Sequence, residues 1–177
     1  IRPLSRIMLG TVQFGMPYGI ANRRGQPSHA DVREIVRYGY EHGVTALDTA
    51  AAYGTSEEVL GAVLAELGLQ TSMTIVSKIA PIAANTDAEA ESCIIESITR
   101  SLRRLGLEQL PVCLIHREDD VRFLPLLAKM VTNGLIGAYG VSLDSQRFLV
   151  AAQAAPFIQL PYNLFDRRFT NFIAGAG

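Results

Sequence analysis

The sequence predicts an α/β protein built on a parallel sheet that is covered by helices. Its 177 residues alternate between short apolar segments typical of strands and longer segments with apolar residues at helical spacing. The short segments are almost wholly hydrophobic, as in parallel strands buried on both faces. Polar side chains follow several of them, which predicts a functional site along one rim of the sheet.

The first half of the chain contains three predicted strands and two predicted helices. The strands cover residues 7–9, 44–47 and 73–76, and a glycine-rich loop from Gly10 to Gly19 follows the first. The helices are bounded by residues typical of helix starts and ends: Ser28 with Asp31 and then Gly43 for one, Thr55 or Ser56 and then Gly68 for the other.

The second half continues the same alternation. The predicted strands cover residues 110–115, 138–141 and 157–160. The predicted helices are a long one that starts at a Thr86–Glu89 capping box and ends at Gly106, one over 123–131 that stops at Gly134, and one over about 145–154.

Periodicity alone fits either a closed barrel or an open doubly wound sheet. An open sheet that binds a dinucleotide calls for Gly-x-Gly-x-x-Gly after its first strand, and residues 10–19 do not match that pattern. Polar residues at the ends of successive strands favour a (β/α)8 barrel. No linker or charge block divides the chain, so residues 1–177 are expected to form a single domain.

Composition excludes several classes of function. The net charge of −1 gives no electrostatic footprint for nucleic acid, and no apolar segment reaches the roughly 20 residues that a membrane span needs. Cys93 and Cys113 are expected to be buried thiols rather than a disulfide or metal ligands. Because the N-terminus lacks the apolar core of a signal peptide, we expect a cytoplasmic protein.

Four side chains at strand ends are the candidate catalytic residues. They are an acid, a phenol, an amine and an imidazole: Asp48, Tyr53, Lys78 and His116. Each also has a structural interpretation: a loop cap for Asp48, a rim aromatic for Tyr53, a solvated charge for Lys78 and a structural histidine for His116. Their shared position at the ends of three successive strands favours one site.

Together these groups suit proton transfer to a carbonyl oxygen. A tyrosine phenol has a pKa of about 10, and we expect the Lys78 ammonium to lower it, with Asp48 holding Lys78 in place. His116 could hydrogen bond to the substrate oxygen. Such a set suits carbonyl reduction, in which a nicotinamide or flavin supplies the hydride.

The sequence resembles the aldo-keto reductases from the first predicted strand to about Arg168. The matching segments are Leu-Gly-Thr-Val-Gln-Phe-Gly (9–15), Leu-Asp-Thr-Ala-Ala-Ala-Tyr-Gly-Thr-Ser-Glu (47–57), Ser-Lys (77–78), Leu-Ile-His (114–116), Gly-Ala-Tyr-Gly-Val-Ser (137–142) and Ile-Gln-Leu-Pro-Tyr-Asn (158–163). The resemblance implies a (β/α)8 barrel and NADPH as cofactor, with NADH in some members.

The same resemblance implies roles for individual residues. Tyr53 is the general acid/base, Lys78 and Asp48 tune it, and His116 orients the carbonyl of a small-molecule substrate. The implied cofactor-binding residues are Gly10, Thr11, Asp48, Ser142 and Gln159. Many relatives have Asn after that serine, where Leu143 stands here. The form of residues 10–27 is similar to bacterial members linked to sugar metabolism.

Length is the main departure from the resemblance. A barrel of this kind needs about 250 residues, and six strands are recognisable in 177. The tail, residues 169–177, resembles either the start of a sixth helix or the family's eighth strand. An open sheet would expose edge strands and favour a homo-oligomer. The alternative to a reductase is a non-catalytic or regulatory binding protein derived from a barrel, or an inactive fragment.

Overall fold

The computed structural model describes residues 4–175. Its strands are β1 (Met8–Gly10), β2 (Ala46–Asp48), β3 (Thr74–Lys78), β4 (Leu110–Ile115), β5 (Ile136–Ser142) and β6 (Phe157–Gln159). Its helices are α1 (Val12–Gly15), α2 (His29–Glu41), α3 (Ser56–Leu67), α4 (Asp87–Leu105), α5 (Leu124–Thr132), α6 (Leu149–Ala152) and α7 (Thr170–Gly175), with 3-10 helices η1 (Glu118–Phe123) and η2 (Gln146–Phe148).

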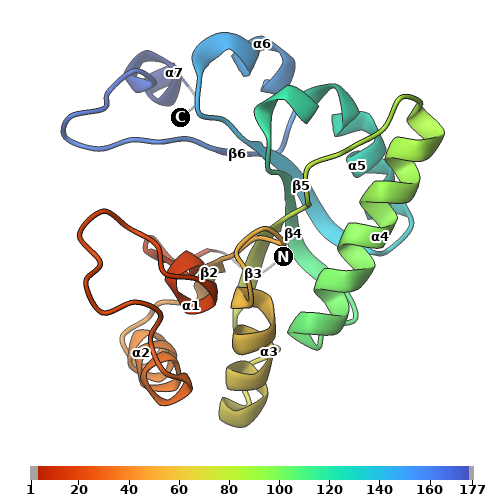
Figure 1. Ribbon diagram of the computed structural model, residues 1–177. Coiled ribbons are helices and arrows are strands. Elements are labelled where there is room, and N and C mark those ends of the chain that lie inside the picture. Colours follow the sequence, from red (N-terminus) through yellow and green to blue (C-terminus); the bar gives the residue numbers. More distant parts are fainter. Residues whose placement is uncertain (1–3, 176–177) are drawn as a thin grey trace.

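The six strands form one parallel sheet in sequence order, β1 to β6. Figure 1 shows this sheet curled, with helices α2 to α6 on its outer side. The arrangement confirms the predicted α/β class and matches an incomplete (β/α)8 barrel. β1 and β6 each pair on one side only, so two sheet edges are open among the described residues.

The helix boundaries follow the capping residues that the sequence predicts. The Ser28 side chain accepts a hydrogen bond from the Asp31 amide, and Thr86 does the same for Glu89, and both complete a capping box. Gly68 and Gly106 end α3 and α4 in the left-handed conformation that favours glycine. Local sequence therefore sets the length of these helices.

Most of the core lies between the sheet and the outer helices. A second, smaller cluster covers the inner face of the sheet and contains the buried side chains of Val76, Val112, Leu114 and Ala138. Met8 of β1 and Phe157 of β6 flank this cluster and are only partly buried. The inner layer of the barrel is therefore formed in the middle of the sheet and left open at both edges.

Two expectations about local structure are wrong. The loop after β1 contains the short helix α1. The helix expected over 145–154 is split into η2 and α6. For the tail, the helix alternative is confirmed over residues 170–175, where the chain forms α7, and the eighth-strand alternative is excluded for those residues. No helix in the described part of the chain is long and apolar enough to span a membrane.

The helix after β2 also begins differently from the expectation of a side-chain cap. Thr55 is the N-cap of α3, but its side chain makes no capping hydrogen bond. The Ser56 hydroxyl instead joins a buried network with Thr11 and Thr49. This network ties the start of α3 to the rim of the sheet.

Candidate active site

The candidate residues gather at the carboxyl ends of the strands. Asp48 ends β2, Lys78 ends β3, Ser142 ends β5 and Gln159 ends β6, while His116 directly follows β4. Because the strands are parallel, these ends share one rim of the sheet. Tyr53 reaches the rim from the loop between β2 and α3.

Lys78 and Asp48 form a buried ion pair. Lys78 Nζ donates to Asp48 Oδ1 at 2.6 Å and to the Thr49 carbonyl oxygen at 3.0 Å. The Lys78 side chain is only 2% exposed. Burial lowers the pKa of Lys78, while the Asp48 carboxylate opposes that shift. Asp48 therefore holds the lysine in place, as the sequence predicts.

The Tyr53 hydroxyl lies beside the same ammonium. Lys78 Nζ is 3.3 Å from Tyr53 Oη, within hydrogen-bond distance. The expected low pKa of the phenol is not found, because burial and the charge of Asp48 raise the pKa of Tyr53 to about 12. At neutral pH Tyr53 is a protonated phenol that accepts a hydrogen bond from a cation.

His116 packs against Tyr53. The two ring centroids are 5.6 Å apart, and the planes meet at 85° in an edge-to-face contact. Burial and the charge of Lys78 lower the pKa of His116. The imidazole is therefore neutral at pH 7 and can hydrogen bond to a substrate oxygen without adding charge.

Ser142 and Gln159 are register partners on β5 and β6. Gln159 Nε2 donates to Asp48 Oδ1 at 3.0 Å, a contact that the sequence did not predict. The backbone N–H of Leu143 donates to the Gln159 carbonyl oxygen at 2.9 Å and joins the ends of the two strands. Gln159 therefore connects the ion pair to the far side of the site.

Gly10 and Thr11 differ in accessibility. Gly10 is exposed at the rim, opposite Asp48 in register. Thr11 is fully buried, and its hydroxyl donates to the Asp48 carbonyl oxygen at 2.8 Å. Thr11 therefore stabilises the end of β2 through this hydrogen bond and exposes no surface to the site.

The loop that carries Tyr53 packs tightly against α1. A Cβ atom at Gly15 would lie 1.8 Å from the Tyr53 carbonyl oxygen, so only glycine fits there. Gly54 packs against the backbone of Gly15, and its φ of 57° is in the left-handed region that favours glycine. These two glycines let the first loop and the Tyr53 loop meet.

Glu57 is a buried residue whose role the sequence analysis missed. It is 1% exposed, accepts a hydrogen bond from Ser77 Oγ at 2.7 Å and lies 3.4 Å from an Arg104 nitrogen. Because Ser77 precedes Lys78, Glu57 fixes the strand end that carries the lysine. Its sequence signals were its place in the first turn of a helix and at the end of the family-like segment 47–57.

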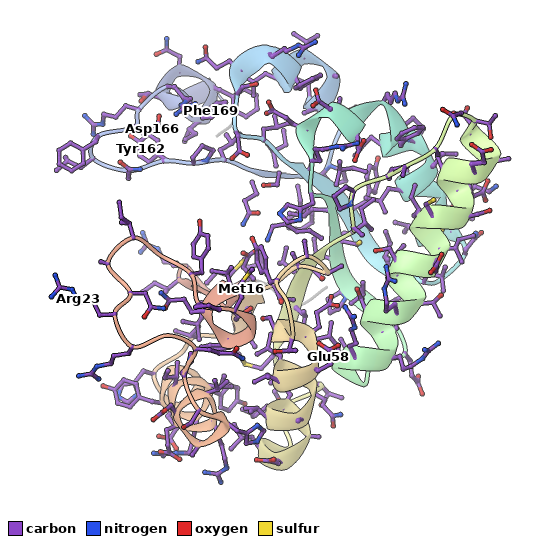
Figure 2. All side chains as sticks on the ribbon, viewed as in Figure 1. Met16, Arg23, Glu58, Tyr162, Asp166 and Phe169 are labelled. Carbon is purple, nitrogen blue, oxygen red and sulfur yellow. The ribbon has the colours of Figure 1, made fainter. Side chains whose placement is uncertain are left out.

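Two loops extend from the rim on opposite sides of the site. In Figure 2 the loop with Tyr162 and Asp166 lies above, and the loop with Met16 and Arg23 lies below. Leu164 and Phe165 on the upper loop are 76% and 95% exposed. The apolar tips of these loops have no covering structure among residues 4–175.

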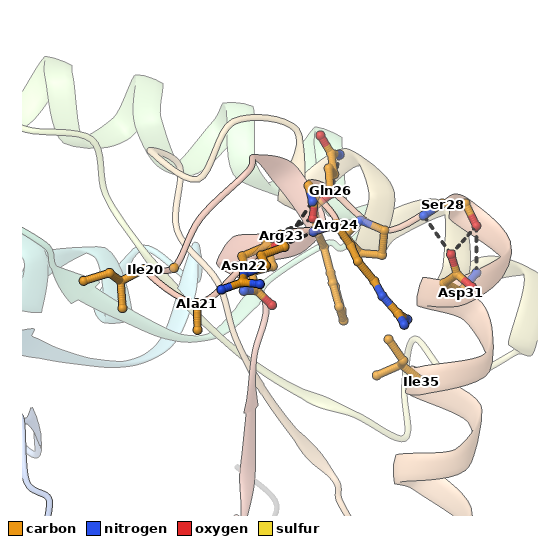
Figure 3. A pocket seen from close by; sticks show the side chains of 14 residues that line it. Ile20, Ala21, Asn22, Arg23, Arg24, Gln26, Ser28, Asp31 and Ile35 are labelled. Carbon is orange, nitrogen blue, oxygen red and sulfur yellow. Dashed lines mark hydrogen bonds between the residues drawn. The ribbon is translucent and has the colours of Figure 1, made fainter.

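The lower loop encloses an open pocket of its own. Figure 3 shows this pocket of about 910 Å³, lined by residues that include Ile20, Asn22, Arg24, Gln26 and Ile35. Asn22 Oδ1 accepts the backbone N–H groups of two following residues at 3.0 Å and so shapes the turn. None of the four candidate catalytic residues lines the pocket.

Comparison with known proteins identifies relatives along nearly the whole chain. Residues 6–173 match the model of the aldo/keto reductase family. The chain is 30% identical over 175 residues to the aldo-keto reductase YhdN of Bacillus subtilis, covering 92% of this chain and 51% of that protein. It therefore spans about half the length of this curated relative.

Solved structures show the same likeness. A crystal structure of a putative aldo-keto reductase from Pseudomonas aeruginosa superposes with a TM-score of 0.81 at 30% identity, over 98% of this chain and 69% of that one. An aldo-keto reductase from Klebsiella pneumoniae in complex with NADPH superposes with a TM-score of 0.73 at 25% identity, over 98% and 60%. From the matched family model, these relatives and the strand-end residues described above, the chain belongs to the aldo/keto reductase family.

Proposed function

We propose that this chain carries the catalytic half of an NAD(P)H-dependent carbonyl reductase, with Tyr53 as the general acid. The observation that carries the proposal is the hydrogen-bonded series from Asp48 through Lys78 to the Tyr53 hydroxyl, at 2.6 and 3.3 Å. A protonated phenol that accepts a hydrogen bond from a cation is a stronger acid than the phenol alone. Positioned proton donors of this kind contribute about 10²–10⁴-fold to a rate.

The donor and acceptor groups on β5 and β6 suit the carboxamide of a nicotinamide. Gln159 donates through Nε2 to Asp48, and its side-chain oxygen has no hydrogen-bond donor among residues 4–175 and can accept one. The half-exposed Ser142 hydroxyl stands beside it in register and can donate or accept. These two side chains would hold the cofactor amide, and the exposed backbone at Gly10 adds a contact surface. The bound nicotinamide would supply the hydride.

His116 and Tyr53 would bind the substrate carbonyl from two directions. Tyr53 donates its proton as the oxygen gains charge, and Lys78 stabilises the phenolate that remains. His116 is neutral at pH 7 because burial and Lys78 lower its pKa, so it acts as a hydrogen-bond donor and not as an acid. The substrate class is therefore an aldehyde or ketone, and sugar-derived carbonyls remain within this proposal.

The test is aldehyde-dependent loss of NADPH absorbance. It requires a protein of the relatives' full length that carries these 177 residues unchanged, called here the long protein. We expect turnover of a simple aromatic aldehyde, and we expect Ser142→Ala to raise the KM for NADPH with little change in kcat. NADPH binding with no turnover of any aldehyde or ketone would contradict the proposal.

A second function is favoured by the open sheet edges for residues 1–177 taken alone. Within residues 4–175, β1 and β6 have no partner on one side, and the loops around the site are uncovered. By itself the chain would bind nicotinamide weakly without turnover, as a binding or regulatory protein or an inactive fragment. Titration of the purified chain with NADPH, followed by fluorescence, separates this case from an active enzyme.

A further inference from the structure

The loop after β5, residues 143–146, is anchored on both sides of Asp144. The backbone N–H groups of Asp144 and Ser145 donate to Glu118 Oε2 at 2.9 and 2.8 Å, and Ser145 Oγ donates to Glu118 Oε1 at 2.8 Å. Arg168 Nη1 donates to the Asp144 carbonyl oxygen at 2.9 Å. Both the backbone N–H and the backbone carbonyl oxygen of Asp144 are therefore hydrogen bonded.

The two anchors come from neighbouring rim loops and are themselves ordered. Glu118 begins η1, two residues after His116. Burial opposes its ionisation, but hydrogen bonds from Ser145 and Asp144 outweigh that effect and lower the pKa of Glu118. Arg168 makes a bidentate contact with Asp166 at 2.8 and 2.7 Å. Two neighbouring loops therefore fix the position of the Asp144 backbone.

The Asp144 carboxylate is exposed at the rim and available to a ligand. Within residues 4–175, the hydrogen bonds of Asp144 are made by its backbone, and its side chain enters no ion pair. Its charge also reaches the site. Burial and the charge of Asp48 raise the pKa of Tyr53 to about 12, and the charge of Asp144 acts in the same direction. Burial and the charge of Lys78 lower the pKa of His116, and the charge of Asp144 opposes that shift.

The other charges near the site are compensated. Lys78 and Asp48 neutralise each other at 2.6 Å, and Tyr53 and His116 are uncharged at neutral pH. The Arg168 guanidinium is bound by Asp166, and Figure 2 shows Arg23 pointing away from the molecule. Asp144 is thus an exposed acid outside these ion pairs, and its charge acts on Tyr53 and His116 as well as on the neighbouring Arg168.

We propose that Asp144 is a specificity-determining residue, which favours carbonyl substrates that carry hydroxyl or ammonium groups and disfavours those that carry a carboxylate or phosphate. The proposal rests on the proposed function and adds the substrate class to it. A fixed carboxylate accepts hydrogen bonds from hydroxyl or ammonium donors at short distance. It repels a second anion, and the repulsion is stronger at a partly enclosed rim than in bulk water.

The test compares three aldehydes of one shape in the long protein: para-carboxybenzaldehyde, para-hydroxymethylbenzaldehyde and para-trimethylammoniobenzaldehyde. We expect the cationic aldehyde to have the highest kcat/KM and the anionic one the lowest. Asp144→Asn should reduce the cation-to-anion ratio by about 3- to 10-fold, the size expected for one charge at the distance of a few side chains. Asp144→Ser should do the same, which guards against an effect particular to the amide.

Asp119→Asn is the matched control. Asp119 is also an exposed acid near this rim, 4.0 Å from Arg147, and its removal should leave the ratio unchanged. In the 177-residue chain, Asp144→Asn should lower the pKa of His116 measured by NMR, and Asp119→Asn should shift it less.

The outcomes separate the two proposals. Absence of turnover with all three aldehydes contradicts the proposed function. Turnover with a cation-to-anion ratio that Asp144→Asn and Asp144→Ser leave unchanged overturns the role of Asp144 alone. An unshifted pKa of His116 in Asp144→Asn would also overturn it, because the carboxylate would then lie out of range of the site.

Discussion

Gln159 Nε2 lies 3.0 Å from Asp48 Oδ1, although the two residues are 111 positions apart and their strands are separated by three others. In a flat sheet, four strand spacings would separate β2 and β6 by about 19 Å. The contact therefore requires a strongly curled sheet. The six strands therefore already have barrel-like curvature. This curvature brings Gln159, the candidate contact for the cofactor amide, to the Lys78–Asp48 ion pair.

Replacing Gln159 by Leu should weaken this connection. The change removes a hydrogen bond to a charged group, which is worth about 1.5–3 kcal/mol at most sites and less at this half-exposed one. We expect about 1 kcal/mol lower free energy of unfolding by urea denaturation, and weaker NADPH binding by the long protein. Gln153→Leu, on the outer side after α6, is the control and should change neither. Equal effects of the two substitutions would contradict the assigned role of Gln159.

Lys78→Met should raise the pKa of His116. Burial and the Lys78 charge lower that pKa from 6.5, and Asp48 opposes them, so loss of the lysine leaves Asp48 to favour the imidazolium. NMR titration of the imidazole measures the shift directly. Asp48→Asn should move the pKa the other way, and an unchanged value in both variants would show that the ion pair does not act on His116.

His116 also makes the stability of the folded chain depend on pH. The pKa of His116 is lower in the folded chain than in the unfolded chain, so the unfolded chain binds protons more readily. The contribution of His116 is fully present above about pH 6.5 and is lost as pH falls through its folded-state pKa. In His116→Gln, the midpoint of urea unfolding should fall less between neutral and mildly acidic pH than in the unchanged chain. The same acid loss in both proteins would show that His116 does not titrate on unfolding.

The buried ion pair should be strongly coupled in a double-mutant cycle. Lys78→Met alone leaves the Asp48 charge with Gln159 as its remaining side-chain donor and should cost about 3 kcal/mol of unfolding free energy. Adding Asp48→Asn removes that charge and should recover most of the loss. The pair of Lys129 and Glu91 has the same 2.6 Å distance but is more exposed, so its coupling should be below about 1 kcal/mol. Similar coupling in the two pairs would contradict the effect of burial.

Much of the fold follows from local signals. The capping boxes at Ser28 and Thr86 and the closing glycines gave the helix limits, and the apolar segments gave all six strands to within a few residues. The approach of Asp48, Tyr53 and Lys78 followed from parallel strands whose ends share a rim.

The remaining features depend on contacts that no local pattern encodes. The Gln159–Asp48 contact depends on sheet curvature, and the burial of Glu57 depends on Ser77 and Arg104 from other elements. The pKa of Tyr53 rises because the phenol is partly buried beside the Asp48 charge, and sequence spacing does not reveal that burial.

The open edges predict self-association of the 177-residue chain. Beside β1 lies an apolar groove of about 500 Å³, lined by residues that include Ile7, Met8, Leu9, Ile35 and Tyr38. Ile7 is 69% exposed and lies directly before an edge strand whose outer backbone groups are unpaired. Sedimentation velocity should show oligomers or aggregates that grow with concentration.

Ile7→Lys should reduce that association, because a charge at the edge opposes strand pairing. Val150→Lys, at an exposed apolar residue on α6, is the control and should leave the association unchanged. A stable monomer at all concentrations would show that the chain covers its sheet edges in another way.

The most direct test of the central claim, that Tyr53 is the proton donor, is the kcat of Tyr53→Phe in the long protein. The substitution keeps the ring packed on His116 and removes only the hydroxyl beside Lys78. We expect kcat for aldehyde reduction to fall by about 10²–10⁴-fold, with NADPH affinity nearly unchanged and with Tyr38→Phe fully active. A Tyr53→Phe protein that reduces aldehydes at the unmodified rate would contradict the assignment of Tyr53 as the acid.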